Sequence, residues 1–146
     1  TAMLAEWLLS HPEVLQGSEE RLQTLWLWHS AEEAEHKNTA FDLYAALGGN
    51  HHWRLVWFRR TTLAFLVDVT RQVLSNLHRD GSLYRPSTWA SAWRTLFGPT
   101  GLVRHIWRPW WAYRRRDFHP NQQASNLSAQ WLEHNRHRFT PVGETG

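Results

Sequence analysis

Apolar residues recur along this chain at the spacing of one face of an α-helix, and they do so nearly from end to end. No segment shows a convincing alternation of apolar and polar residues, which is the pattern of a half-buried β-strand. The spacing therefore predicts an all-α protein. Its 146 residues are enough for one domain with a real core. We expect residues 1–139 to form a single helical domain and residues 140–146 to be a flexible tail.

Capping and breaking residues predict where the helices begin and end. A first helix, Ala2 to Ser10, should stop at His11-Pro12, because the residue before a proline is pushed out of the α region. A long helix should run from a cap at Ser18 to the Gly48-Gly49 stop. The remaining helices are expected at about 51–78 with Asn50 as the cap, 89–97 with Ser87 as the cap, 102–115 with a disturbance at Pro109, and 124–137.

The composition excludes several classes of site. The chain has no cysteine, so a disulfide framework, a thiolate metal site and a cysteine nucleophile are all excluded. No apolar run reaches the roughly 18 residues of a membrane-spanning helix. Met3 is the only methionine, and translation from it would begin inside a helical pattern that has no cap. We therefore expect the N-terminus to be cut and some partner helices to be missing.

The long helix carries ionisable side chains where an apolar face should be. On a wheel of about 100° per residue, one narrow face combines apolar and ionisable positions. Its members are Leu22, Trp26, His29, Glu33, His36, Ala40 and Leu47, with Leu25, Glu32 and Leu43 along one edge. An amphipathic helix normally keeps its charges on the opposite face, and unpaired burial would be costly. A metal ion would explain the pattern, because it binds carboxylate and imidazole groups together.

The spacing within this face suggests which residues bind the metal. Glu33 and His36 form a Glu-x-x-His unit, which projects inward in carboxylate-bridged dimetal helical bundles. His29 lies one turn earlier, and Glu32 could be a second ligand or an outer partner of His36. We expect this face to be directed at other helices. A buried ionic network, or an exposed helix rich in Glu and His, would explain the same residues. Lys37 and Asp42 fall outside the face, and salt bridges are expected for them.

A longer stretch of this helix resembles a known family. The segment Trp28 to Asp42 reads Trp-His-Ser-Ala-Glu-Glu-Ala-Glu-His-Lys-Asn-Thr-Ala-Phe-Asp. It resembles the hallmark of a bacterial family of predicted metal-dependent hydrolases, Trp-His-x-x-Glu-Glu-x-Glu-His-Lys-x-x-Ala-Phe-Asp. Further matches cover nearly the whole chain: Thr1-Ala2 with Leu4-Ala5-Glu6, Tyr44 with Gly48-Gly49, and Tyr113 with Asp117-Phe118-His119-Pro120.

The resemblance implies a ferritin-like helical bundle, present in part, with additional C-terminal helices. Full members of the family carry an earlier Gln-Glu-x-x-His helix and a further Glu-His pair just upstream of the Thr-Ala match. This chain would then be the C-terminal portion, with one of two Glu-x-x-His helices. The resemblance also implies a hydrolase that uses divalent metal ions. Iron is the expected metal, with manganese and zinc as alternatives.

The expected metal ligands are Glu33, His36, His29 and Glu6, the last from the preceding helix. For Glu6 an exposed position on a frayed helix end is an equal alternative. Glu32 is the candidate catalytic residue, since it could take the proton of a water activated by the metal. An alternative function is a di-iron oxidase or oxygenase, in which the same ligands hold two irons that meet dioxygen. His119 could contribute to the site or cap a helix.

A third reading is a non-catalytic helical module that binds a partner or an anionic surface. The chain has 11 tryptophans and a net charge of +3, and arginines cluster at Arg114 to Arg116. We favour a solvated helix end for the arginines, because no nucleic-acid motif accompanies them. Core and interface packing is expected for most of the tryptophans rather than a platform for nucleic acid. These are Trp53, Trp57, Trp89, Trp93, Trp107, Trp110, Trp111 and Trp131.

The expected partners follow from these readings. We expect an enzyme that acts on a small-molecule substrate in the cytoplasm and binds no nucleic acid. The pair Trp110-Trp111 beside arginines leaves peripheral membrane contact open. A homo-oligomer is also left open.

Overall fold

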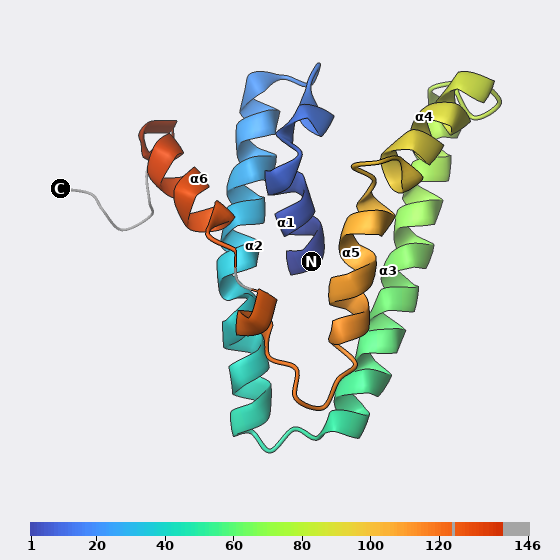
Figure 1. Cartoon of the computed structure of the whole chain (residues 1–146). Helices are drawn as coiled ribbons and strands as arrows, with labels where there is room; N and C mark the ends of the chain where they lie inside the picture. Colours follow the sequence, from blue (N-terminus) through green and yellow to red (C-terminus); the bar gives the residue numbers. More distant parts are fainter. Residues whose placement is uncertain (124, 139–146) are drawn as a thin grey trace. The chain divides into compact units, whose positions relative to one another are not determined.

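The computed structural model describes residues 1–123 and 125–138 (Figure 1). Six α-helices make up most of this part: α1 (Ala2–Ser10), α2 (Glu20–Ala46), α3 (His51–Arg79), α4 (Pro86–Phe97), α5 (Leu102–Ala112) and α6 (Leu127–Asn135). Three short 3₁₀ turns accompany them, η1 (Pro12–Leu15), η2 (Pro120–Gln123) and η3 (Arg136–Arg138). The described residues contain no strand, so the all-α prediction is confirmed. The expected tail at 140–146 and the expected helix start at Ala124 lie outside the described residues.

Local signals place several helix ends as predicted. Helix α1 ends at Ser10, directly before His11-Pro12. Helix α2 stops in a Schellman turn, in which the Gly48 N–H donates to the Ala45 carbonyl and the Gly49 N–H to the Tyr44 carbonyl. Gly48 has φ +75°, a left-handed conformation that favours glycine. Asn50 then caps α3, because its side chain accepts a hydrogen bond from the Trp53 backbone N–H at 3.0 Å.

Helices α4, α5 and α6 differ from the sequence prediction, and α6 runs over Leu127–Asn135 rather than to 137. Helix α4 begins at Pro86 rather than after a Ser87 cap. Proline suits the first turn because its φ is already helical and the N–H that it lacks would have no partner there. Helix α5 tolerates Pro109 inside it and ends at Ala112, about a turn before the expected end.

The chain divides into two compact units. One consists of the described part of Thr1–Asp42 and His105–Gly146, and the other of Leu43–Arg104. In the first unit, α1, α2 and α6 (drawn in Figure 1) share a small core of side chains. It is built on Leu9, Ala31 and Ala34, and the partly buried residues packed against it are Leu27, Leu127, Trp131 and Leu132. The prediction of a single domain over 1–139 stays a prediction.

Many large apolar side chains lie exposed. Core packing is wrong for six of the eight tryptophans, because Trp53, Trp57, Trp89, Trp93, Trp107 and Trp111 are all exposed. Interface packing of these side chains stays a prediction. Trp131 does pack against the core, and Trp7 is the buried tryptophan that the sequence pattern did not single out. None of the described helices combines the length and apolar character needed to cross a membrane.

Candidate metal centre

The ionisable residues of α2 form two pairs, each spanning one helical turn. His29 Nε2 lies 3.9 Å from Glu33 Oε1, and His36 Nε2 lies 3.9 Å from Glu32 Oε2. The close pairs are therefore spaced i, i+4, whereas the sequence pattern emphasised the i, i+3 unit of Glu33 and His36. The two carboxylates are about one-third exposed, and the imidazoles of His29 and His36 are 54% and 72% exposed.

The prediction that this face of α2 is directed at other helices is wrong for the described residues. The apolar residues that flank the Glu–His pairs are exposed as well, namely Leu22, Leu25, Trp26, Leu43 and Leu47. Helix α2 instead buries a different strip, made of Ser30, Ala31 and Ala34. Small side chains let neighbouring helices come close, which favours this strip as the packing surface. We call the exposed strip, from Leu22 through His29, Glu33 and His36 to Leu47, the Glu–His stripe.

The donors on the Glu–His stripe suit a metal ion in chemical type. Carboxylate and imidazole groups suit iron, manganese and zinc. Two ligands bound to one ion at about 2.1 Å lie about 3.0 to 3.4 Å apart at octahedral or tetrahedral angles, so the donors of each 3.9 Å pair would have to move closer to share a cation. The described residues nevertheless contain no group of three or more His, Cys, Asp or Glu side chains placed to hold an ion. Each pair therefore supplies two donors, which is a partial ligand set.

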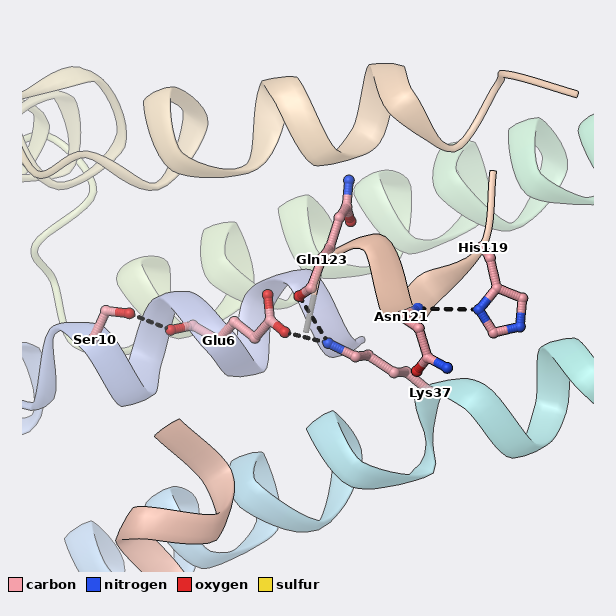
Figure 2. Close-up of polar contacts among 6 residues, drawn as sticks. All are labelled: Glu6, Ser10, Lys37, His119, Asn121 and Gln123. Atoms are coloured by element: carbon pink, nitrogen blue, oxygen red, sulfur yellow. Dashed lines mark hydrogen bonds and ion pairs between the residues drawn. The ribbon is translucent and has the colours of Figure 1, made fainter. Parts of the chain in front are cut away.

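Glu6 points inward from α1 and is paired with Lys37 of α2 (Figure 2). Lys37 Nζ lies 2.5 Å from Glu6 Oε1 and donates a second hydrogen bond to the Gln123 carbonyl at 3.0 Å. Both side chains are nearly buried, 15% exposed for Glu6 and 13% for Lys37. The exposed, frayed position that was the alternative for Glu6 is thus wrong, and the expected salt bridge of Lys37 is confirmed. A ligand role for Glu6 stays a prediction.

His119 joins the loop after α5 to the end of α2. Its Nε2 lies 2.9 Å from Asp42 Oδ1, and the Asn121 backbone N–H donates to its Nδ1 at 3.2 Å (Figure 2 shows the second bond). Because Nδ1 accepts, the neutral ring carries its proton on Nε2 and donates it to Asp42. Both ring nitrogens are thus engaged, which leaves no free lone pair for a metal. His119 acts here as a connector between two segments. The Asp42 contact is a hydrogen bond to His119, and the salt bridge expected for Asp42 stays a prediction.

Aromatic contacts surround this connection. The Phe41 ring packs edge-on against His119, with 5.1 Å between centroids, and against Phe118 at 5.9 Å. The Tyr113 and Phe118 rings are tilted by 56°, with 5.0 Å between centroids. The Ala-Phe-Asp and Asp-Phe-His-Pro segments, 77 positions apart at their polar contact, therefore form one cluster. Sequence reasoning did not bring them together, although both segments had matched the same family pattern.

The comparisons with known proteins bear on all of these elements. A sequence model of the family described as "Predicted metal-dependent hydrolase" matches residues 1–124. The chain belongs to this family. No curated protein and no solved structure matches it.

The match to the metal-dependent hydrolase family spans the Glu–His stripe, the Glu6–Lys37 pair and the His119–Asp42 connection. Family membership supports metal dependence and hydrolysis at the level of the family. The matched region also contains two histidines in contact, His11 and His105, which the sequence analysis did not single out. The His11 and His105 rings meet edge-on with 6.0 Å between centroids. Partial burial, with a smaller contribution from His11, lowers the pKa of His105, and Glu6 opposes the shift.

Proposed function

We propose that this chain forms part of a metal-dependent hydrolase and that α2 is its metal-binding helix. The observation that carries the proposal is the pair of Glu–His contacts on one face of α2, inside the region matched to the family. His29, Glu33 and His36 would hold the metal, and iron, manganese or zinc would suit these donors. When bound, the metal supplies the Lewis acidity that brings the pKa of a water molecule toward neutrality.

Glu32 is the residue that we assign to proton transfer. Its carboxylate lies on the edge of the Glu–His stripe and is about one-third exposed, so a substrate water can reach it. Glu32 Oε2, which lies 3.9 Å from His36 Nε2, would accept the proton of the attacking water. Lys37 cannot share this role, because Glu6 and the Gln123 carbonyl already bind its ammonium group.

The two donors of each Glu–His pair do not complete the coordination sphere of a metal ion. We propose that a further helix with carboxylate and histidine ligands covers the Glu–His stripe in the active enzyme, in a ferritin-like arrangement. Such a helix would also remove the exposed Leu22, Trp26 and Leu43 from water, which is favourable in proportion to the apolar area buried. The apolar ends and the ionisable centre of the stripe would then serve a single interface.

The test is the metal content of the intact protein and of single variants, measured by elemental analysis, together with the shift of melting temperature on adding metal. Glu33→Ala and His36→Ala should both abolish metal loading, because each ligand depends on the other to complete coordination. His119→Ala should have a smaller effect, since both of its ring nitrogens are engaged elsewhere.

Glu35→Ala is the matched control, because Glu35 lies on the same helix, is exposed and belongs to neither Glu–His pair. It should leave metal content unchanged. Full metal loading and an unchanged metal-induced stabilisation in both Glu33→Ala and His36→Ala would show that α2 is structural. Consumption of dioxygen by the metal-loaded protein, without hydrolysis, would favour the di-iron oxidase instead.

A further inference from the structure

We propose that α5 and the arginine-rich turn after it form a docking surface for an anionic phospholipid membrane. This α5 surface consists of Trp107, Arg108, Trp111, Arg114 and Arg116. Trp107 and Trp111 lie one helical turn apart and are 55% and 57% exposed. Two large rings in water on one helix are unfavourable unless something covers them. This observation is independent of the metal centre, and the inference goes beyond the proposed function.

Each exposed ring of the α5 surface is paired with a guanidinium group. The Arg108 guanidinium lies 5.9 Å from the centre of the Trp107 ring, and that of Arg114 lies 4.2 Å from the centre of Trp111. Arginine stacked on an aromatic ring can still present its N–H groups at the edge, where they suit phosphate oxygens. An apolar ring beside a phosphate-binding group matches the boundary between acyl chains and headgroups, where tryptophan is favoured.

The charge of this segment complements an anionic surface. Residues 102–116 contain five arginines, Arg104, Arg108, Arg114, Arg115 and Arg116, and no acidic residue. The first acid to follow is Asp117, and Arg115 already binds it through two hydrogen bonds. Basic residues are attracted to anionic leaflets over a distance of about one Debye length. The remaining arginines thus leave a positive charge that the neighbouring sequence does not neutralise.

The dimensions of α5 favour a position in the plane of the membrane surface. Its 11 residues span about 16 Å, roughly half of the hydrocarbon thickness of a bilayer. No described helix is suited to crossing a membrane. Nucleic acid fits less well, because single-strand binding needs ring faces on which bases stack. A guanidinium group already lies over one face of Trp107 and of Trp111.

The experiment is sedimentation of the full chain with vesicles of phosphatidylcholine, with or without phosphatidylserine. We expect binding to the serine-containing vesicles alone, and we expect added salt to weaken it. The double variant Arg108→Gln/Arg114→Gln should weaken binding about 25-fold, since each basic residue near such a surface contributes about five-fold. The double variant Trp107→Ala/Trp111→Ala should weaken binding as well, because it removes the apolar rings that would enter the boundary between acyl chains and headgroups. Circular dichroism would show that both variants keep their helices.

The chain offers matched controls on α2. Trp26 is 53% exposed and Arg21 is exposed, so Trp26→Ala and Arg21→Gln remove similar groups outside the α5 surface. Both should leave vesicle binding unchanged. Absence of binding, equal binding to neutral vesicles, or double variants that bind like the wild type would each overturn the proposal. It would also be overturned if single-stranded nucleic acid bound more tightly than the vesicles and with the same dependence on these residues.

Discussion

Replacing Lys37 with methionine should destabilise the fold more than any change at an exposed ion pair. The variant keeps most of the length of the side chain but removes the ammonium group. It leaves the Glu6 carboxylate, only 15% exposed, without its cation, and the Gln123 carbonyl without its donor. A largely buried charge that loses its partner cannot recover its hydration in place.

The magnitude follows from the burial of the pair. Removing one partner of a buried ion pair costs about 3–5 kcal/mol, and the residual exposure of 13–15% places Lys37→Met near the lower end, at about 3 kcal/mol. For a chain of this size, that corresponds to a melting temperature lower by about 10 °C. The double variant Glu6→Gln/Lys37→Met removes the unpaired charge as well, so it should lose only about 1 kcal/mol.

The assay is urea unfolding followed by circular dichroism, on the wild type, Glu6→Gln, Lys37→Met and the double variant. Glu6→Gln keeps an oxygen that can accept from Lys37, so it should cost about 1 kcal/mol. The cycle measures the coupling between the two side chains, which we then expect to be about 3 kcal/mol. Arg138→Met is the control, because it removes a largely exposed ion pair with Glu20 at 3.6 Å and should cost less than about 0.5 kcal/mol. Single variants whose effects simply add, or a Lys37→Met effect as small as that of Arg138→Met, would refute the reasoning.

Three further predictions concern other parts of the chain. Gly49→Ala should destabilise the protein by about 1–3 kcal/mol in thermal melts, because a Cβ at this position would lie within 2.5 Å of ring atoms of Tyr44. The Tyr44 ring is held there by its hydroxyl, which donates to the Asn50 carbonyl. An unchanged melting temperature would contradict this packing. The pKa of His105 is lowered in the folded protein, so as the pH falls the unfolded chain protonates this ring before the folded chain does. The contribution of His105 to the free energy of unfolding is therefore complete above pH 6.5 and declines below it, until the pH reaches the lowered pKa. His105→Gln should flatten that window in urea titrations at several pH values, and an identical pH profile would refute the assignment. Residues 1–146 as a monomer should bind metal weakly or not at all, because the Glu–His stripe is a partial ligand set. Stoichiometric binding at micromolar or tighter affinity in calorimetry would show that the metal ligands are other residues.

The helix ends were predictable because their signals are local. The Gly48-Gly49 stop and the Asn50 cap each depend on backbone hydrogen bonds within a few residues. The packing face of α2 was not predictable in the same way. A helical wheel tells which residues share a face, but it does not tell which face another helix will cover. The Glu–His stripe looked like the buried face, yet the smaller Ala31 and Ala34 allowed the closer approach.

The polar contacts of Lys37 and Asp42 also combine a part that the sequence predicts with a part that it does not. Spacing placed Lys37 and Asp42 outside the Glu–His stripe and favoured salt bridges for both. The structure confirms the salt bridge of Lys37 and gives Asp42 a hydrogen bond to His119. It could not name Glu6 and His119 as the partners, because these lie 31 and 77 positions away. Contacts between distant segments depend on how the chain folds back, and no local periodicity encodes that.

The two hydrogen bonds of His119 are aligned head to tail, because the ring accepts one at Nδ1 and donates the other from Nε2. The Asn121 amide donates to Nδ1, and Nε2 donates in turn to the Asp42 carboxylate. Donors and acceptors aligned in this way polarise one another, so the negative charge at the end of α2 makes Nδ1 a better acceptor for the loop amide. The Asp42 carboxylate therefore strengthens a hydrogen bond that it does not itself make, and through the ring it steadies the backbone of the loop at Asn121.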